Sequence, residues 1–293
     1  MMRHAGRPPG PNDCVLKLPD GRLLGYAEFG DPAGEPLFFF HGNPGSRFGG
    51  AFLDAAAKAR GVRVVALERP GFGLSDFQLG RTIADWPADV REAAGNLGFD
   101  RFAVLGFSAG GPYALACAAA MSPSGEGLTA VGVVSGVGLS QPRAGNGLVS
   151  HVRASLVSLL ARRAPGLFFR WAARRAPPPD RAVLSRPAAR AALLQSEREA
   201  FRHGSRGVID ETALLAQPWG VDFSAITASV RLWHGEDDRT VAVSGARAVA
   251  DALPECVATF VPGGGHFWLL DHGGEVLDAL FPGEQQAEQS RDS

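Results

Sequence analysis

The segment that most constrains this chain is the turn Gly106-Phe107-Ser108-Ala109-Gly110-Gly111. The apolar run from Arg101 to Phe107 predicts a buried strand before the turn, and the small-residue run from Pro112 to Ala120 predicts a helix after it. The glycines of this Gly-x-Ser-x-Gly pattern lack a Cβ, so the chain can turn sharply and leave Ser108 at the apex, beside the free N–H groups of the helix. This arrangement suits a nucleophile that attacks a carbonyl group, although the pattern also occurs in ordinary glycine-rich turns.

Short apolar runs alternate with helical patterns on both sides of this turn. The chain has 293 residues, of which 45% are hydrophobic, so it can bury a large core as one domain with an insertion or as two domains. A hairpin over 15–29 comes first, and the later alternation predicts a mostly parallel α/β sheet with helices on both faces. The expected parallel strands are 37–40, 62–67, 102–106, 131–134, 230–233 and 257–261, with helices near 52–59, 85–97, 113–120, 243–253 and 275–281.

A helical segment interrupted by prolines separates the sixth expected strand from the seventh. We expect this insertion over 140–220, with helices near 148–161, 167–175 and 188–202. Ligands bind beyond the carboxyl ends of parallel strands, so an insertion at that edge would cover the site as a lid. The expected organisation is a tail over 1–13, a core over 14–139 and 221–283, the helical lid over 140–220, and a second tail over 284–293.

The expected insertion is basic, although the formal net charge of the chain is -1. It holds thirteen arginines and five acidic residues, a formal charge of +8. The arginines alternate with helical apolar positions and no nucleic-acid motif accompanies them, which favours a solvated helical face. An entrance that attracts anions is one alternative, and a surface for nucleic acid or an anionic membrane is another. That last alternative predicts binding that weakens steeply with salt.

Two further features bear on cellular location. The longest apolar run, 128–139, is too short to span a bilayer, and no apolar stretch follows the N-terminal Met1–Asp13. The three cysteines, Cys14, Cys117 and Cys256, lack metal-ligand spacing, and their odd number disfavours a disulfide framework. These features predict a cytoplasmic protein without a membrane span.

A serine nucleophile needs an imidazole to accept its proton and a carboxylate to orient that imidazole. Among the seven histidines, His266 follows three glycines at the end of the strand expected over 257–261, so a flexible loop can bring it to Ser108. Asp237 and Asp238 follow the preceding expected strand. The order serine, aspartate, histidine differs from the orders in chymotrypsin and subtilisin.

That order and three further motifs resemble the α/β-hydrolase superfamily. The segment from Gly235 to Val241 is similar to its Gly-x-x-Asp-x-x-Val pattern, which implies that Asp238 is the acid and Asp237 a bystander. His41-Gly42-Asn43-Pro44-Gly45 resembles its His-Gly-x-Pro-Gly loop. The segment from Glu68 to Asp76 resembles its Asp-x-Pro-Gly-x-Gly-x-Ser loop, with glutamate in place of the first aspartate.

The resemblance covers about residues 15–140 and 228–282 and is closest to the serine esterases and lipases that carry a lid. It implies an α/β fold with an eight-stranded, mostly parallel sheet and a helical lid after the sixth strand. It also implies a serine hydrolase that cleaves a carboxylic ester or related acyl compound through an acyl-enzyme on Ser108. His266 would relay the proton and Asp238 would hold His266, while the backbone N–H groups of Asn43 and Ala109 would bind the oxyanion.

The same constellation serves lactonases, thioesterases, carbon–carbon bond hydrolases, aminopeptidases and perhydrolases, and sequence does not separate them. A ligand-binding or regulatory protein that retains the triad is the alternative outside catalysis. The expected partner is a small acyl substrate, without metal, organic cofactor or nucleic acid, and a homodimer is compatible with the sequence. We expect an apolar acyl pocket beneath the lid, because a lid helix can bury its apolar face only against the core or the substrate. The residues expected to line it are Phe168, Phe169, Trp171 and Trp219.

Overall fold

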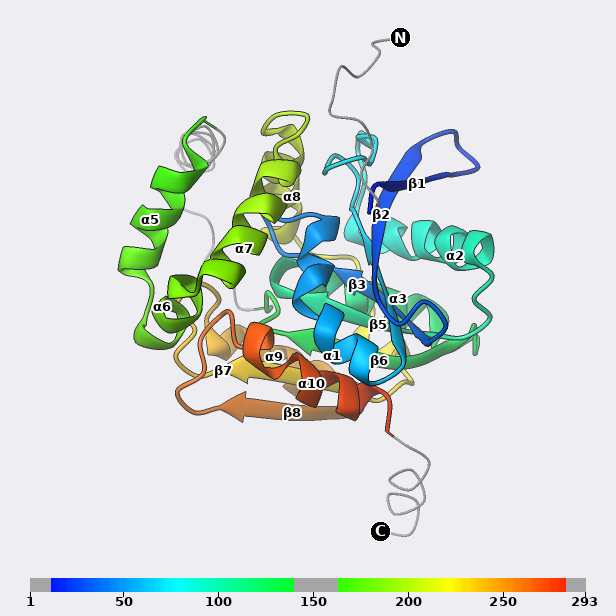
Figure 1. The fold of residues 1–293 in the computed structure, drawn as a ribbon. Helices are drawn as coiled ribbons and strands as arrows, with labels where there is room; N and C mark the ends of the chain where they lie inside the picture. Colours follow the sequence, from blue (N-terminus) through cyan, green and yellow to red (C-terminus); the bar gives the residue numbers. More distant parts are fainter. Residues whose placement is uncertain (1–11, 140–162, 283–293) are drawn as a thin grey trace.

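An eight-stranded, mostly parallel sheet forms the centre of the molecule (Figure 1). This computed structural model describes residues 12–139 and 163–282. The strand order is β1-β2-β4-β3-β5-β6-β7-β8, in which β2 runs antiparallel to β1 and β4 and the other neighbours are parallel. The predicted fold class is therefore confirmed. The strands are β1 (Cys14–Lys17), β2 (Leu23–Gly30), β3 (Glu35–Phe40), β4 (Val62–Leu67), β5 (Phe102–Phe107), β6 (Leu128–Val134), β7 (Val230–Gly235) and β8 (Cys256–Val261).

Helices cover both faces of this sheet, because successive side chains of its central strands point to opposite sides. In β3, Phe38 and Phe40 belong to a core cluster with residues of α2, α3 and α9, whereas Leu37 and Phe39 belong to a second cluster with residues of α1 and α10. Each central strand is therefore apolar throughout its buried length. The helices are α1 (Asp54–Ala59), α2 (Trp86–Leu97), α3 (Gly111–Met121), α9 (Val243–Ala252) and α10 (Leu269–Leu280).

Within the described residues, four α-helices lie between β6 and β7 and form a group of their own at one side of the sheet in Figure 1; we call them the insertion. They are α5 (Pro165–Arg175), α6 (Pro178–Ser185), α7 (Pro187–Ala200) and α8 (Arg206–Leu215). The sequence did not predict α6 or α8. The proline run 177–179 was expected to break the chain, but proline is compatible with the first turn of a helix and α6 begins there. The helix expected near 148–161 lies outside the described residues.

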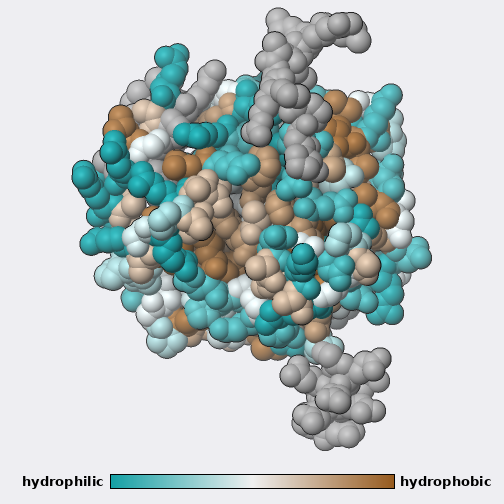
Figure 2. All heavy atoms as spheres, viewed as in Figure 1, coloured by the Kyte–Doolittle hydropathy of each residue, from teal (hydrophilic) through white to brown (hydrophobic). Residues whose placement is uncertain are grey.

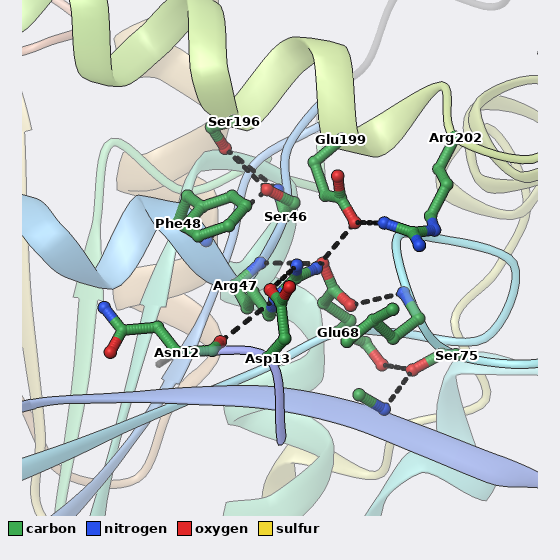
Figure 3. A network of polar contacts seen from close by, with 12 residues as sticks. Asn12, Asp13, Ser46, Arg47, Phe48, Glu68, Ser75, Ser196, Glu199 and Arg202 are labelled. Carbon is green, nitrogen blue, oxygen red and sulfur yellow. Dashed lines mark hydrogen bonds and ion pairs between the residues drawn. The ribbon is translucent and has the colours of Figure 1, made fainter. Parts of the chain in front are cut away.

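One buried arginine fastens α7 to the core (Figure 3). Arg47, at the start of the 3₁₀ helix η1 (Arg47–Phe52), donates to Glu68 at 2.7 Å and to Glu199 of α7 at 2.8 Å. Its guanidinium also pairs with Asp13. Beside it, the Ser46 backbone N–H donates to Ser196 Oγ of α7 at 3.0 Å. The glutamate that replaces aspartate in the 68–76 loop thus belongs to the joint between core and insertion.

A second buried cluster fastens α8. Glu211 accepts hydrogen bonds from Arg69 at 2.7 Å, Arg81 at 2.6 Å and the Tyr113 hydroxyl at 2.8 Å. Burial alone would raise the pKa of Glu211, but Arg69 and Arg81 more than offset burial and hold this pKa below its ordinary value. In both joints a carboxylate of the insertion is thus hydrogen-bonded to arginine of the core, Glu199 to Arg47 and Glu211 to Arg69 and Arg81.

Hydrophilic side chains gather over the insertion on the left of the view in Figure 2, and apolar side chains are visible where this face is hollowed near its centre. The exposed arginines of the insertion include Arg170, Arg174, Arg181 and Arg198. Across residues 12–139 and 163–282, no helix is both long enough and apolar enough to cross a membrane.

Candidate active site

Ser108 occupies a strained turn between β5 and α3. Its backbone has φ 54°, in the left-handed region that serine seldom adopts. The turn is tight, since a Cβ built on Gly106 would lie 2.4 Å from the Gly110 carbonyl oxygen, and one built on Gly110 would lie 2.1 Å from the Phe40 carbonyl oxygen. The glycines are therefore required by close backbone approach. The turn presents Ser108 at the carboxyl end of the central strand β5, at the start of the 3₁₀ helix η3 (Ser108–Gly110).

His266 and Asp238 come together at the ends of the neighbouring strands β7 and β8. His266 Nδ1 lies 2.7 Å from Asp238 Oδ2, a hydrogen-bond distance for an imidazole N–H and a carboxylate. The other oxygen, Asp238 Oδ1, accepts from the Thr240 and Val241 backbone N–H groups at 2.7 and 2.8 Å. Burial alone would raise the pKa of Asp238, but the hydrogen bonds from His234, His266 and the backbone reverse this effect and hold the pKa well below its ordinary value. Asp238 is therefore an ionised, fully oriented carboxylate, whereas Asp237 is exposed.

His234 is a second histidine at this carboxylate, and the sequence did not single it out. Its Nε2 lies 3.0 Å from the Val241 carbonyl oxygen and 3.4 Å from Asp238 Oδ2. Its position at the end of a buried strand, directly before the loop that holds Asp238, was the available signal. His234 thereby steadies the loop in which Asp238 lies.

The loop after β3 approaches Ser108 from the other side. A Cβ built on Gly42 would lie 3.4 Å from Ser108 Cβ, so this loop and the turn are in van der Waals range. The Asn43 side chain donates to the Val208 carbonyl oxygen at 3.2 Å and to Thr212 Oγ1 at 3.1 Å, both on α8. Ala109 is buried directly after Ser108. The two residues expected to bind an oxyanion thus lie on segments that flank Ser108.

His41 is buried beneath this loop. Its Nδ1 lies 2.7 Å from the Gly42 carbonyl oxygen, and Arg69 donates a backbone N–H toward its Nε2 at 3.4 Å. Burial and the nearby Arg69 charge lower the pKa of His41 well below its ordinary value. His41 is thus a neutral group with local hydrogen-bond partners.

A cavity of about 210 Å³ joins these elements. Ser108 and His266 both line it, as do the loop residues Gly42 and Asn43. Its wall is largely aromatic or aliphatic, and the α7 helix supplies part of it: Leu193, Ser196 and Glu197. The insertion therefore contributes directly to the cavity in which Ser108 is placed. The remaining lining residues are Phe39, His41, Pro44, Gly45, Gly49, Phe52, Phe107, Thr240 and Phe267.

None of the residues expected to line an acyl pocket is among the described residues that line this cavity. Trp219 is not among the residues that line it; its ring packs near Phe223 with centroids 6.3 Å apart, in the core cluster on the α3 face. Phe168, Phe169 and Trp171 lie along α5, but their side chains are outside the described part of the structure. Leu193 and Glu197 of α7, which the sequence did not single out, line the cavity instead.

Asp180 is another residue that sequence reasoning missed. It is buried on α6 and its Oδ1 accepts the Phe267 backbone N–H at 2.9 Å, one residue after His266. Burial raises its pKa above the ordinary value. A single aspartate in the first turn of a helix has no distinctive sequence pattern, so this contact could not be predicted from the sequence. The hydrogen bond to Phe267 shows that α6 contacts the loop that holds His266.

Comparison with known proteins identifies the same architecture. A sequence model described as "Alpha/beta hydrolase family" matches residues 37–279. Two solved structures share the fold: a hydrolase from Pseudomonas aeruginosa, with TM-score 0.71 and 18% identity over 92% of this chain and 98% of that one, and an esterase from Exiguobacterium antarcticum, with TM-score 0.70 and 17% identity over 92% and 97%.

A curated relative matches a shorter segment. It is a proline iminopeptidase from Xanthomonas citri, 32% identical over 121 residues. The match spans 40% of this chain and only 38% of that relative.

Proposed function

Because the chain belongs to the alpha/beta hydrolase family, we propose that it is a serine hydrolase that cleaves a carboxylic ester or related acyl compound through Ser108. The observation that carries this proposal is the Asp238–His266 hydrogen bond of 2.7 Å at a cavity that Ser108 also lines. Nucleophile, base and orienting acid are the three groups that acyl transfer through serine needs. They come from the carboxyl ends of β5, β7 and β8, where ligands bind in open α/β sheets.

In the proposed first half-reaction, Ser108 Oγ attacks the substrate carbonyl carbon while His266 Nε2 takes the hydroxyl proton. Asp238 accepts from His266 Nδ1–H, which fixes the tautomer and stabilises the imidazolium that forms. The backbone N–H groups of Asn43 and Ala109 stabilise the oxyanion, and each donor contributes about 3 kcal/mol to lowering the barrier. His266 then protonates the leaving alkoxide, and the acyl-enzyme remains.

In the second half-reaction, water replaces the alcohol. His266 takes a proton from water, the hydroxide attacks the acyl carbon, and the Ser108 oxygen leaves with the proton that His266 returns. The products are a carboxylic acid and free enzyme. We include in the proposal that the insertion acts as a lid, since α7 forms one wall of the cavity.

Two other functions use the same groups. Cleavage of an amide has support in the relative named proline iminopeptidase, although the match covers 38% of that relative. A regulatory protein that keeps the triad would bind an acyl ligand and turn it over at most once. The same three catalytic groups can also cleave lactones, thioesters and carbon–carbon bonds.

The deciding experiment combines a fluorophosphonate probe with hydrolysis of 4-nitrophenyl acetate. We expect rapid 4-nitrophenol release over many turnovers and probe attachment to Ser108, located by peptide mass spectrometry. Ser108→Ala should lose both signals while its melting temperature stays unchanged, because one hydroxyl is removed and no core volume is lost. Labelling of Ser108→Ala at the wild-type rate would overturn the nucleophile assignment, and a single slow turnover would favour the regulatory alternative.

A further inference from the structure

Glu197 is the one carboxyl group among the described residues that line the cavity. It lies on α7, on the same cavity as Ser108 and His266, and aromatic and aliphatic side chains form much of the surrounding wall. Its Oε2 is buried and has no hydrogen-bond partner among the residues that the structure describes. Glu197 Oε2 is thus buried beside the cavity without a hydrogen-bond donor among the described residues.

This situation is costly and contrasts with that of two other acids of the insertion, Glu199 and Glu211. A buried carboxylate without a partner loses its hydration without compensation, so native structures pair such groups. Two residues along the same helix, Glu199 accepts from Arg47 and from Arg202 at 2.8 and 2.9 Å. On α8, Glu211 is held by two arginines. The insertion is rich in arginine, yet no ion pair among the described residues includes Glu197.

We infer that Glu197 binds a protonated amine of the substrate, so that the cavity selects acyl compounds that carry an ammonium group. This inference rests on the proposed hydrolase function and names the substrate class for it. An ammonium has three N–H donors and no acceptor, which complements a carboxylate that has acceptors only. A charge-assisted hydrogen bond in an apolar surrounding is strong and would satisfy the buried Oε2.

Burial supports this reading. It raises the pKa of Glu197 to about 7, with no neighbouring charge as a cause. The carboxyl group therefore exchanges its proton near neutrality, and a bound cation would favour the ionised form. A buried glutamate that binds no ligand would have the same raised pKa. Ligands that differ only in charge are therefore needed to show whether Glu197 binds an ammonium.

Paired substrates isolate that charge. We would compare benzyl glycinate with benzyl propionate, benzyl β-alaninate with benzyl butyrate, and benzyl 4-aminobutyrate with benzyl pentanoate. Each pair replaces an ammonium by a methyl group, and the three lengths vary its distance from the carbonyl carbon. At pH 7.5, wild type should prefer the ammonium ester in at least one pair by tenfold or more in kcat/KM.

Glu197→Gln is the test variant because it keeps shape and removes the charge. It should lower kcat/KM for the preferred ammonium ester by about 10- to 100-fold, the range for hydrogen bonds to charged groups, and change the methyl ester less than threefold. Glu197→Asp, which keeps the charge on a shorter arm, should restore part of the preference. Arg198→Gln, an exposed neighbour on the same helix, should leave both esters unchanged.

A binding measurement separates this inference from the hydrolase proposal. Titration of n-butylammonium into Ser108→Ala needs no turnover, and binding should weaken at least tenfold in the double variant that adds Glu197→Gln. That result supports the ammonium site even if neither ester is hydrolysed, in which case the hydrolase proposal alone fails. Equal affinity in both proteins, or equal losses on ammonium and methyl esters, would overturn the ammonium site while leaving the hydrolase proposal intact.

Discussion

Two carboxyl groups flank the cavity region, one from the sheet core and one from the insertion, and their surroundings are opposite. Asp238 of the core accepts two backbone N–H groups and lies within hydrogen-bond distance of His266. Glu197 of the insertion has an oxygen without any partner among the described residues. The pKa of Asp238 is held below its ordinary value, and that of Glu197 is raised to about 7.

The different surroundings of Asp238 and Glu197 suit two different tasks, orienting an imidazole and binding a ligand. A carboxylate that must stay ionised and hold an imidazole needs donors arranged around it before substrate arrives. A carboxyl group that recognises a ligand has to be left incomplete, since the ligand supplies the missing donor. Pairs of titratable groups whose environments move their pKa values apart are typical of sites with divided roles. The predictions below test whether the core carboxyl group and the insertion carboxyl group are divided in this way.

The largest expected effect is at the core carboxyl group. Asp238→Asn should lower kcat by about four orders of magnitude, as loss of the carboxylate favours the wrong imidazole tautomer in a serine protease triad. Asp237→Asn is the matched control, because that side chain is exposed and one residue away. It should change kcat by less than threefold. Steady-state rates on 4-nitrophenyl acetate would check both variants, and the reverse ranking would move the acid by one residue.

The free energy of unfolding should respond differently to substitution of Glu211, which is paired with arginines, and of Glu197, which is not. Glu211→Gln leaves the buried Arg69 and Arg81 without their shared carboxylate, so it should lower the free energy of unfolding by about 3 to 5 kcal/mol. Glu197→Gln removes an uncompensated buried acid and should leave the unfolding free energy unchanged or higher. Urea titrations followed by tryptophan fluorescence would measure both. A comparable loss in the two variants would mean that Glu197 is part of the fold's support.

The core and its candidate site could be predicted because their signals are local in sequence. Ser108 and Asp238 follow the buried strands β5 and β7 within a few residues, His266 follows the edge strand β8, and parallel strands bring their carboxyl ends to one edge of the sheet. The steric need for glycine at Gly106 and Gly110 is likewise indicated by a local pattern, Gly-x-Ser-x-Gly. These positions depend little on how distant parts of the chain dock.

The insertion could not be predicted to the same depth. The periodicity over 188–202 indicates α7 closely, but periodicity does not say which residues of the helix face the cavity. That choice depends on long-range pairs such as Arg47–Glu199 and Ser46–Ser196, which join residues about 150 positions apart. Consequently Glu197 was not singled out, and Trp219 was expected at a pocket that its observed packing does not reach.

A pH profile provides a smaller but more specific test of the divided roles. The titratable side chains among the cavity-lining residues are His41, Glu197 and His266. Only the ionised form of Glu197 attracts an ammonium, so the ratio of kcat/KM for the ammonium ester over its methyl partner should rise about tenfold as pH increases through 7. Both esters use the same catalytic groups, so the ratio cancels any effect of pH that the two esters share. Glu197→Gln should make this ratio independent of pH, and a rise that persists in this variant would assign the titration to another group.

The smallest expected effect concerns the apolar wall that the insertion contributes. Leu193 of α7 lines the cavity and packs in a small cluster with Leu184 of α6, which does not line it. Each buried methylene contributes about 0.8 kcal/mol, or about fourfold in kcat/KM per carbon while room remains. Leu193→Ala should therefore shift the preferred acyl chain of 4-nitrophenyl esters one or two carbons longer, whereas Leu184→Ala should lower the melting temperature and leave the preferred length unchanged. The comparison across acetate, butyrate, hexanoate and octanoate esters decides whether α7 measures the acyl chain. Equal shifts in both variants would mean that the cluster only holds the insertion together, and chain-length selection would then have to come from the core side of the cavity.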